Sequence, residues 1–428
     1  MMDALLDILR ASGADGWEVT DTATEKWEFY FIRHRLDQNR ASQVQKTKVK
    51  VYRLSEDQQF LGSATGEIAP TATRAEAEQT VTRLLEQAAL VKNPAYTLRA
   101  PAQAPADAGE QVDVAQVARD FIQVMQELPE TETEDINSYE IFASFVNQRF
   151  ISSTGIDVTS VYPSSMIEVV VNARKEGHEI ELYRNYTSGT CDRQMLKENL
   201  AETLRISRDR LHTVPTPALG KADLVLSNAA AVDVYDWFIS RMSAAMKYQG
   251  LSDWEIGQSV CEGEGGSKLT IRAVKHLKNS SRNAAYDAEG APIRDLTLID
   301  HGVAKNWWGS RQFTQYLKIE DAFIAGNFDV SGEGEAEEAL RTGKYLEVLD
   351  FSDFQVDALT GDIAGEIRLG YWHDGEQVQI VSGGSVSGNM RKLSGVLRFS
   401  TATRQYDQYL IPHITRLPGV TITGGAEE

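Results

Sequence analysis

The apolar residues near the N-terminus follow a helical spacing first and an alternating spacing afterwards. The stretch "DALLDILRASGADG" repeats apolar positions every three or four residues, whereas "WEFYFIRH" and "KTKVKVYR" alternate apolar with polar residues. Alternation of this kind is typical of half-buried antiparallel strands. Helical spacing returns in "TRAEAEQTVTRLLEQAAL". The pattern therefore predicts an N-terminal α-β-β-α unit within residues 1–95.

A second periodic region begins after a stretch that has no apolar periodicity. Residues 96–113 are rich in alanine and contain proline, which predicts a surface linker. Residues 114–128 then have helical spacing, residues 139–189 alternate like a meander of strands, and "DRQMLKENLAETLRISRDRLH" is strongly helical. We predict a middle α/β unit over residues 114–218 that packs with the first unit.

The C-terminal half consists mainly of short alternating segments separated by glycine-containing turns. One strand and one helix come first, and the later segments are "KLTIRAV", "RDLTLIDHG", "KYLEVLDFS", "GEIRLGYWHDGEQVQI" and "GVTIT". Such frequent turns predict a β-rich domain over residues 219–428, a closed or wrapped antiparallel sheet with a few helices. We expect the whole chain to belong to the α+β class.

The helix predicted within "SNAAAVDVYDWFISRM", residues 227–242, bears most directly on function. A short apolar strand precedes it, and Ser227 or Asn228 is placed to cap its first turn. The residues expected on its buried face are Val234, Trp237, Phe238 and Met242, and those expected on its polar face are Asp233, Asp236, Ser240 and Arg241. The two acidic residues are either a ligand-binding pair or a complement to the helix dipole. We favour the second interpretation, in which the helix is a structural wall.

The amino-acid composition argues against nucleic acid and membranes as partners. The chain of 428 residues has 43 basic and 62 acidic side chains and a formal charge of −19, which repels nucleic acid. No apolar run approaches the length of a membrane span, and the first residues lack the basic and apolar regions of a signal peptide. Cys191 and Cys261 form no disulfide framework or metal-binding pair. We expect a cytoplasmic protein without nucleic-acid or membrane partners.

The histidines are too scattered for a local metal motif. They occupy positions 34, 178, 212, 276, 301, 373 and 413, and no two are spaced for one helical face. His178 stands beside Glu179 and Glu181 in an alternating strand, where a cross-strand ion pair is a better interpretation than a metal site. His301 and His373 stand beside glycine residues in predicted turns.

Two glycine-rich stretches do not match known catalytic or phosphate-binding motifs. "GGSVSGN" has Val386 where a nucleophile elbow requires serine, and "CEGEGGSK" at 261–268 lacks the spacing of a phosphate-binding loop, so we expect a mobile acidic loop there. From the residues alone we assign no catalytic, cofactor-binding or metal-binding residue in this chain.

Several C-terminal phrases together resemble one family. "AAYDAEGAPIRDLTLIDHGVAKNWWGSRQF" carries the pattern D-x-E-G-x-P followed by L-I-x-x-G-V, and the tract from residue 343 to 390 carries G-D, G-Y and a closing S-G-N. These phrases are similar to those of the TldD/PmbA family. The resemblance extends to the N-terminal unit and to "STGIDVTS", so it spans nearly the whole chain, although its specificity lies in the C-terminal half.

The resemblance implies a two-subunit zinc peptidase that cleaves peptides or unfolded chains inside a closed chamber. The TldD branch carries H-E-x-x-x-H on the helix after the first C-terminal strand. That helix is "AAAVDVYDWFISRM" here, without histidine or glutamate. The chain therefore resembles the TldE branch, also called PmbA or modulator of DNA gyrase, which lacks the metal and pairs with a zinc-bearing relative.

Three functions follow as competing hypotheses. The leading one is a non-catalytic subunit that forms a heterodimer with a TldD-like partner and uses exposed aromatics such as those in "NWWGSRQF" at the interface. The second is a self-associating homodimer that binds peptides without cleaving them. The third is a hydrolase that uses dispersed groups such as Asp233, Asp236 and Asp287. No zinc is expected in this chain under the first two hypotheses.

Overall fold

The computed structural model describes residues 2–102, 109, 111–128, 131, 133–319 and 322–425. Twenty strands and nine helices are assigned in this part of the chain. In chain order they are α1 (Met2–Ala11), β1 (Gly16–Ile32), β2 (Arg35–Leu54), β3 (Leu61–Ile68), α2 (Arg74–Ala89), α3 (Val114–Gln126), β4 (Glu134–Ser152), β5 (Asp157–Lys175), β6 (His178–Ser188), α4 (Arg193–Arg210), β7 (Val214–Pro215), β8 (Gly220–Leu226), α5 (Ala231–Arg241), α6 (Ala244–Tyr248), β9 (Leu269–Val274), β10 (Leu296–Asp300), β11 (Val303–Ala304), α7 (Arg311–Tyr316), β12 (Asn327–Gly332), α8 (Glu337–Leu340), β13 (Tyr345–Val356), β14 (Asp362–His373), β15 (Val378–Ser382), β16 (Ser385–Asn389), α9 (Met390–Leu393), β17 (Arg398–Phe399), β18 (Thr403–Tyr406), β19 (Tyr409–Pro412) and β20 (Thr415–Ile422).

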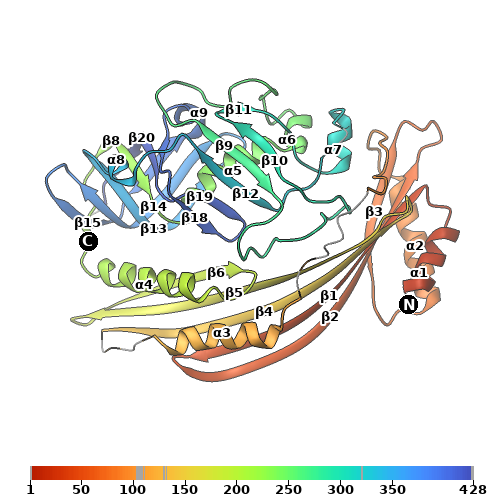
Figure 1. The fold of residues 1–428 in the computed structure, drawn as a ribbon, viewed down its shortest axis with the longest axis horizontal. Coiled ribbons are helices and arrows are strands. Elements are labelled where there is room, and N and C mark those ends of the chain that lie inside the picture. Colours follow the sequence, from red (N-terminus) through yellow and green to blue (C-terminus); the bar gives the residue numbers. More distant parts are fainter. Residues whose placement is uncertain are drawn as a thin grey trace.

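One antiparallel sheet forms the N-terminal half of the molecule. Its strand order is β3-β2-β1-β4-β5-β6, and the long strands cross the lower part of Figure 1. Strand β1 pairs with β4 from Glu18 opposite Ser152 to Ile32 opposite Ser138. Because β1 lies in the first predicted unit and β4 in the second, the two units share one sheet. The pattern had also not predicted β3, which adds a third strand to the first unit.

The strands β1 and β2 are much longer than the alternating segments that predicted them. They contain 17 and 20 residues, and their middle parts are polar. Side chains bond across this polar part, where Thr47 Oγ1 donates to Asp21 Oδ1 at 2.7 Å and Gln45 Nε2 donates to the same carboxylate at 3.1 Å. Such cross-strand pairs let the ladder continue where apolar alternation is lost.

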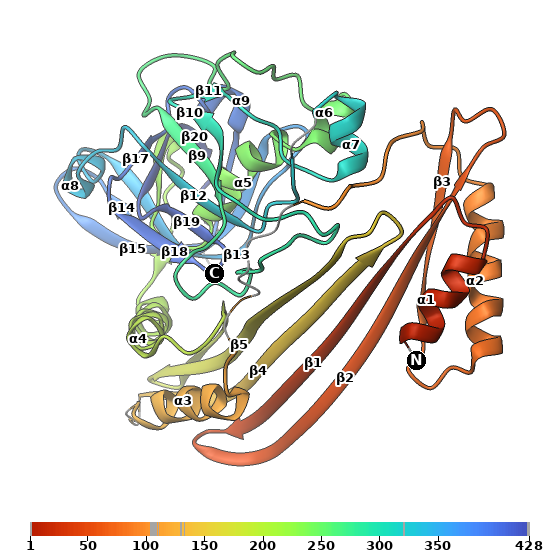
Figure 2. The same cartoon turned by 45° about the vertical axis from the view of Figure 1, so that its right-hand side comes forward.

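Helices cover the two ends of this sheet. Figure 2 shows α1 and α2 packed at one end and α3 and α4 towards the other. Helix α2 begins with a capping box, because Thr73 and Glu76 each accept a hydrogen bond from the other's backbone N–H. The apolar residues under α3 and α4 also include Leu349 and Leu369 of the C-terminal domain. The sheet and the C-terminal domain are therefore joined through a common core.

The C-terminal domain is built from two sheets. In the first, strands β13, β8, β20, β16 and β14 pair in sequence and β14 pairs again with β13, which closes the ring. The second sheet has the order β11-β10-β9-β12-β19-β18. The expectation of a closed sheet in an α+β protein is confirmed. Most pairs are antiparallel, but β8 with β13, β12 with β19 and β7 with β15 are parallel, which the turn-rich sequence did not indicate.

The start of the predicted linker is anchored to both domains. The Tyr96 ring meets Tyr52 of the sheet and Tyr316 of α7 edge-on, with centroids 6.4 and 6.0 Å apart. The Arg99 guanidinium donates to the Ala322 carbonyl at 2.8 Å. Residues 103–108 and 110 of this linker lie outside the described part. Among the described helices, none is long and apolar enough to cross a membrane.

Candidate functional site

The helix α5 follows β8 directly, as the sequence predicted, but its N-cap residue has no side chain that could cap it. Its N-cap residue is Ala230, and no side chain accepts from the first turn. Ser227 Oγ instead donates to Glu347 Oε1 at 2.6 Å, and Asn228 Oδ1 accepts from the Ala230 N–H at 3.0 Å. Of the two predicted caps, Ser227 is wrong, because it is held by a carboxylate of β13 that only the fold brings near. The Asn228 side chain does accept from an N–H at the start of the helix.

The buried face of α5 agrees with the prediction, and one residue of the polar face does not. The buried side chains are Val234, Trp237, Phe238 and Met242, all at most 3 % exposed. Arg241, expected on the polar face, is fully buried. Its guanidinium lies 5.2 and 5.0 Å from the ring centroids of Trp237 and Trp254 and pairs with Asp253. Two aromatic faces and one carboxylate stabilise this buried charge.

Asp233 and Asp236 form a half-buried acidic pair on the remaining face of α5. Asp236 accepts hydrogen bonds from Tyr409 Oη at 2.8 Å and Ser240 Oγ at 3.1 Å. Burial, and then repulsion from Asp236 and Asp353, raises the pKa of Asp233 to about 6. Within the described ranges, no group of three or more histidine, cysteine or acidic side chains is arranged to hold a metal ion. The two carboxylates therefore repel each other on this face, and Tyr409 and Ser240 donate to Asp236.

The histidines remain scattered in the fold. His301 lies in a turn, as predicted, with a φ of 48°, and its ring contacts the Asp300 carboxylate at 2.8 Å. His373 was predicted in a turn but ends β14, where its ring stacks on Tyr345 at 4.1 Å. Beside His178, the predicted cross-strand ion pair is present, and it is formed by Glu179 with Arg174 at 2.9 Å.

The two cysteines and the loop 261–268 have structural rather than catalytic environments. Burial raises the pKa of the Cys191 thiol to about 12 and that of Cys261 to about 11, so neither is a thiolate nucleophile at neutral pH. The loop 261–268, expected to be mobile, is held by hydrogen bonds from the Gly266 and Ser267 N–H groups to the carbonyls of Gly395 and Leu397. Local composition could not predict these hydrogen bonds, because they join segments more than a hundred residues apart in the sequence.

Asp287 of the D-x-E-G-x-P phrase organises a turn. Its carboxylate accepts from the N–H groups of Glu289 at 2.8 Å, Ala291 at 2.9 Å and Ile324 at 2.8 Å. Gly290 follows at a φ of +75°, and a Cβ there would lie 2.7 Å from a ring carbon of Phe150 in β4. The phrase that carries the family resemblance therefore docks the C-terminal domain onto the N-terminal sheet, and Asp287 is fully engaged in that role.

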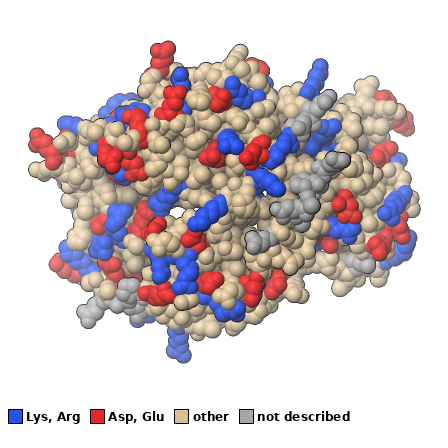
Figure 3. Space-filling view, viewed as in Figure 1, with Lys and Arg blue, Asp and Glu red and all other residues tan. Residues whose placement is uncertain are grey.

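A cleft between the two domains opens beside the N-terminus of α5. One cavity of about 410 Å³ is lined by α4, β6, residues 228–230 and residues 349–354 of β13. Figure 3 shows acidic and basic side chains interspersed where the upper domain meets the sheet. Ion pairs cross this boundary: Arg404 with Glu202 at 2.6 Å, and Arg184 and Arg210 with Asp350. The sequence could not reveal these pairs, whose members lie more than 130 residues apart.

One strand edge faces this cleft. Strand β8 pairs with β13 only as far as Val348, and residues 350–356 of β13 pair on their other side with β14. No described strand pairs with the side of residues 350–354 that β8 leaves free, and Ser352 and Asp353 are exposed. Unpaired N–H and C=O groups on such an edge are the groups that an extended peptide uses.

The fold defines a two-domain protein in which a long curved sheet carries a closed β-domain. Residues 219–424 match the model of the PmbA/TldA metallopeptidase C-terminal domain. This match places residues 219–424, the C-terminal domain, in the TldD/PmbA family. No curated protein matches the sequence.

Solved structures share the complete fold. TldE from Thermococcus kodakarensis matches with a TM-score of 0.78 and 13 % identity, over 98 % of this chain and 100 % of that one. A putative modulator of a DNA gyrase from Thermotoga maritima MSB8 has a TM-score of 0.77 and 14 % identity, over 99 % of both chains. A putative modulator of DNA gyrase from Bacteroides thetaiotaomicron VPI-5482 has a TM-score of 0.74 and 18 % identity, over 99 % of this chain and 98 % of that one. At these identities the likeness establishes the shared architecture.

Proposed function

We propose that this chain is a TldE-like, non-catalytic subunit that acts with a TldD-like zinc peptidase on peptides or unfolded chains. The observation that carries the proposal is the chemistry of α5. The TldD branch is expected to present H-E-x-x-x-H on this helix, whereas here its partly exposed face presents Asp233 and Asp236.

These two residues do not fit a zinc ion. A catalytic zinc site takes three protein ligands, mostly imidazoles, and leaves one position for the water that it activates. On α5, Asp236 is occupied by the Tyr409 and Ser240 hydroxyls, and the raised pKa of Asp233 reflects burial together with repulsion between neighbouring carboxylates. Peptide hydrolysis would then depend on a metal centre that the partner supplies.

The cleft gives this subunit a role in holding substrate. An extended peptide can pair with the free side of residues 350–354 of β13, and the 410 Å³ cavity beside that edge offers space for a side chain. Main-chain pairing gives affinity without a strict sequence requirement. This property suits unfolded substrates.

A homodimer that binds peptides is the second candidate. Strand β2 pairs with β3 only over residues 47–54, which leaves one side of residues 35–46 free among the described strands. Three exposed apolar side chains lie on this part of the β1–β2 hairpin: Ile32, Leu36 and Val44. A second copy could pair along this edge.

The aromatics expected at the interface are not available there. Trp307 is 7 % exposed, and the half-buried Trp308 donates its Nε1–H to the Ile239 carbonyl at 2.9 Å. They are core residues of the C-terminal domain, so an interface must use other surfaces. We place both subunits in the cytoplasm as part of the proposal, which agrees with two unpaired cysteines.

A peptidase assay in three arms tests the proposal. An unstructured peptide is incubated with the purified chain, with a histidine-bearing TldD-like protein from the same genome, and with both. We expect cleavage when the two are combined, and its loss when a chelator is added. Chelator-resistant cleavage by this chain alone would contradict the proposal, as would the failure of every such relative to bind it.

A further inference from the structure

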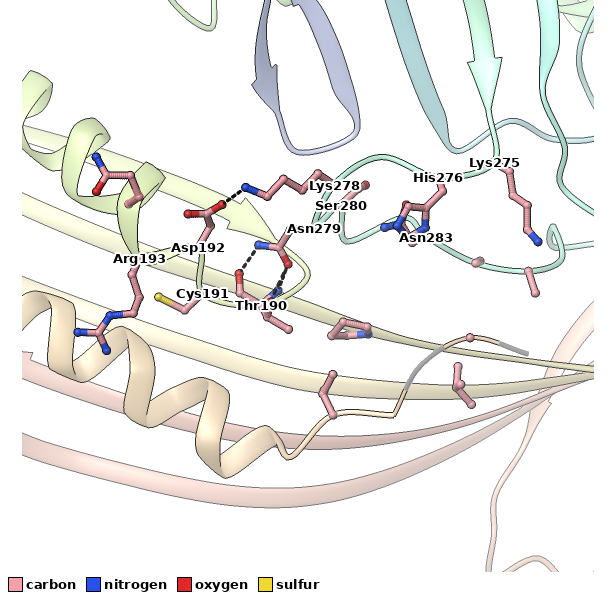
Figure 4. A pocket seen from close by; sticks show the side chains of 17 residues that line it. Thr190, Cys191, Asp192, Arg193, Lys275, His276, Lys278, Asn279, Ser280 and Asn283 are labelled. Atoms are coloured by element: carbon pink, nitrogen blue, oxygen red, sulfur yellow. Dashed lines mark hydrogen bonds and ion pairs between the residues drawn. The ribbon is translucent and has the colours of Figure 1, made fainter. Parts of the chain in front are cut away.

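A second, larger cavity lies in the same interdomain cleft, at the start of α4. Its volume is about 960 Å³. Figure 4 shows its two walls: Thr190, Cys191, Asp192 and Arg193 on the side of the sheet, and the loop after β9 on the side of the C-terminal domain. The cavity is distinct from the one beside α5, with which it shares no lining residue.

The loop after β9 brings three basic side chains to this cavity. They are Lys275, His276 and Lys278. Lys278 is paired with Asp192 at 2.9 Å. Among the described residues, no carboxylate lies within 4.0 Å of the Lys275 ammonium or the His276 ring. The nearby Asp295 accepts from the Lys275 backbone N–H at 2.9 Å, and its side chain pairs with Arg272 at 3.2 Å.

Lys275 and His276 give this cavity two basic groups that have no carboxylate partner within 4.0 Å among the described residues. A concave surface with low-dielectric walls concentrates the field of such groups and attracts an anion. The lining also includes apolar residues from both walls: Val112, Val161, Pro163, Ala284 and Ala285. The site therefore suits a ligand with an anionic end and an apolar body.

The basic loop is fixed before any ligand arrives. The Asn279 side chain donates to the Thr190 carbonyl at 2.7 Å and accepts from the Thr190 N–H at 2.7 Å (Figure 4). Ser280 Oγ donates to Asn327 Oδ1 at 2.6 Å, and Asn283 Nδ2 donates to the Leu277 carbonyl at 2.7 Å. A preorganised site loses less entropy on binding than a flexible one.

We propose that this cavity binds the free α-carboxylate of a peptide, with Lys275 and His276 as its anion-binding groups. The apolar lining receives the last side chain of the peptide. The proposal rests on the proposed function in one respect, the choice of a peptide as the ligand. It adds that the subunit distinguishes chains with a free C-terminus from chains without one.

Direct binding tests the site without any peptidase activity. Two fluorescent unstructured peptides of one sequence, one with a free C-terminus and one amidated, are titrated with the full chain in an anisotropy measurement. We expect the free acid to bind about five- to tenfold more tightly, because a charge-assisted hydrogen bond is lost in the amide. The preference should shrink as salt is added.

Substitutions test which residues cause the preference for the peptide with a free C-terminus. Lys275→Gln combined with His276→Gln should abolish the difference between the two peptides while leaving the affinity for the amide unchanged. Lys305→Gln, on an exposed lysine outside the cavity lining, is the matched control and should keep the full preference. Circular dichroism and thermal unfolding verify that each variant is folded.

The outcomes separate the two proposals. Equal binding of the acid and the amide by the unmodified chain would overturn the carboxylate site and leave the peptide-binding role standing. A loss of preference in Lys305→Gln as large as in the double variant would also overturn it. If neither peptide binds, the peptide-holding role in the proposed function fails together with the site.

Discussion

At the scale of single residues, the sequence predicted which positions of α5 are buried but not what surrounds its polar residues. Val234 and Phe238 follow the helical period, and they are fully buried. Asp236 meets Tyr409, and Arg241 meets Trp254 and Asp253. These partners come from other elements, so no local pattern could identify them.

Replacement of Asp233 by asparagine should stabilise the protein at high pH and have little effect at low pH. The folded-state pKa, about 6, lies above the ordinary value of 3.8. The ionised carboxylate therefore destabilises the folded state increasingly as pH rises from about 4 to about 6, and fully above that. At pH 8 we expect a gain of about 1–2 kcal/mol in the free energy of unfolding. Urea unfolding at about pH 4.5 and about pH 8 measures it, and a gain that is the same at both pH values would contradict the account.

Replacement of Arg241 by alanine should destabilise the protein by about 2–4 kcal/mol, because it removes a buried cation from between two indole rings and leaves a cavity. Arg391→Ala is the matched control. Arg391 pairs with the same Asp253 at 2.9 Å, but its side chain is 35 % exposed, so the loss should stay below about 1 kcal/mol. Equal losses in the two variants, measured by urea unfolding at neutral pH, would show that the buried stacking contributes little.

At the scale of elements, the prediction succeeded where apolar spacing is regular and failed where pairing is nonlocal. The helices α3 and α4 lie within one or two residues of their predicted ranges. The polar middle of β2 is a strand because it pairs with β1, and the acidic loop 261–268 is held by residues 395–397. Both depend on partners distant in sequence, which single-segment periodicity does not encode.

The turn at Gly290 tests the role of the D-x-E-G phrase. Gly290→Ala places a Cβ against Phe150 at a φ of +75°, so we expect a loss of about 2–4 kcal/mol in the free energy of unfolding. Gly250 has a φ of +72°, and nothing lies within 4 Å of the position that a Cβ would occupy there, so Gly250→Ala should cost only the backbone strain, about 1–2 kcal/mol. If urea unfolding finds the same loss of stability in the two variants, the close approach of the domains at Gly290 is not important.

At the scale of the whole molecule, the resemblance identified the family and the class, while the architecture between the domains came from the structure. The sequence placed a boundary near residue 96, yet one sheet spans it and the β-domain docks on that sheet through Asp287 and Gly290. The candidate cleft arises from this docking. Its ion pairs and its basic loop join residues from distant parts of the chain, so composition and motif spacing could not predict them.

The central claim is that this chain contributes binding surface and that a partner contributes the metal. The zinc content of the purified chain tests the claim most directly, because the proposed function assigns the metal centre to the partner and none to this chain. After dialysis without chelator, elemental analysis should find no stoichiometric zinc in this chain alone and one zinc per complex with its TldD-like partner. One zinc per chain in the isolated protein, lost on His178→Ala or His301→Ala, would contradict the account.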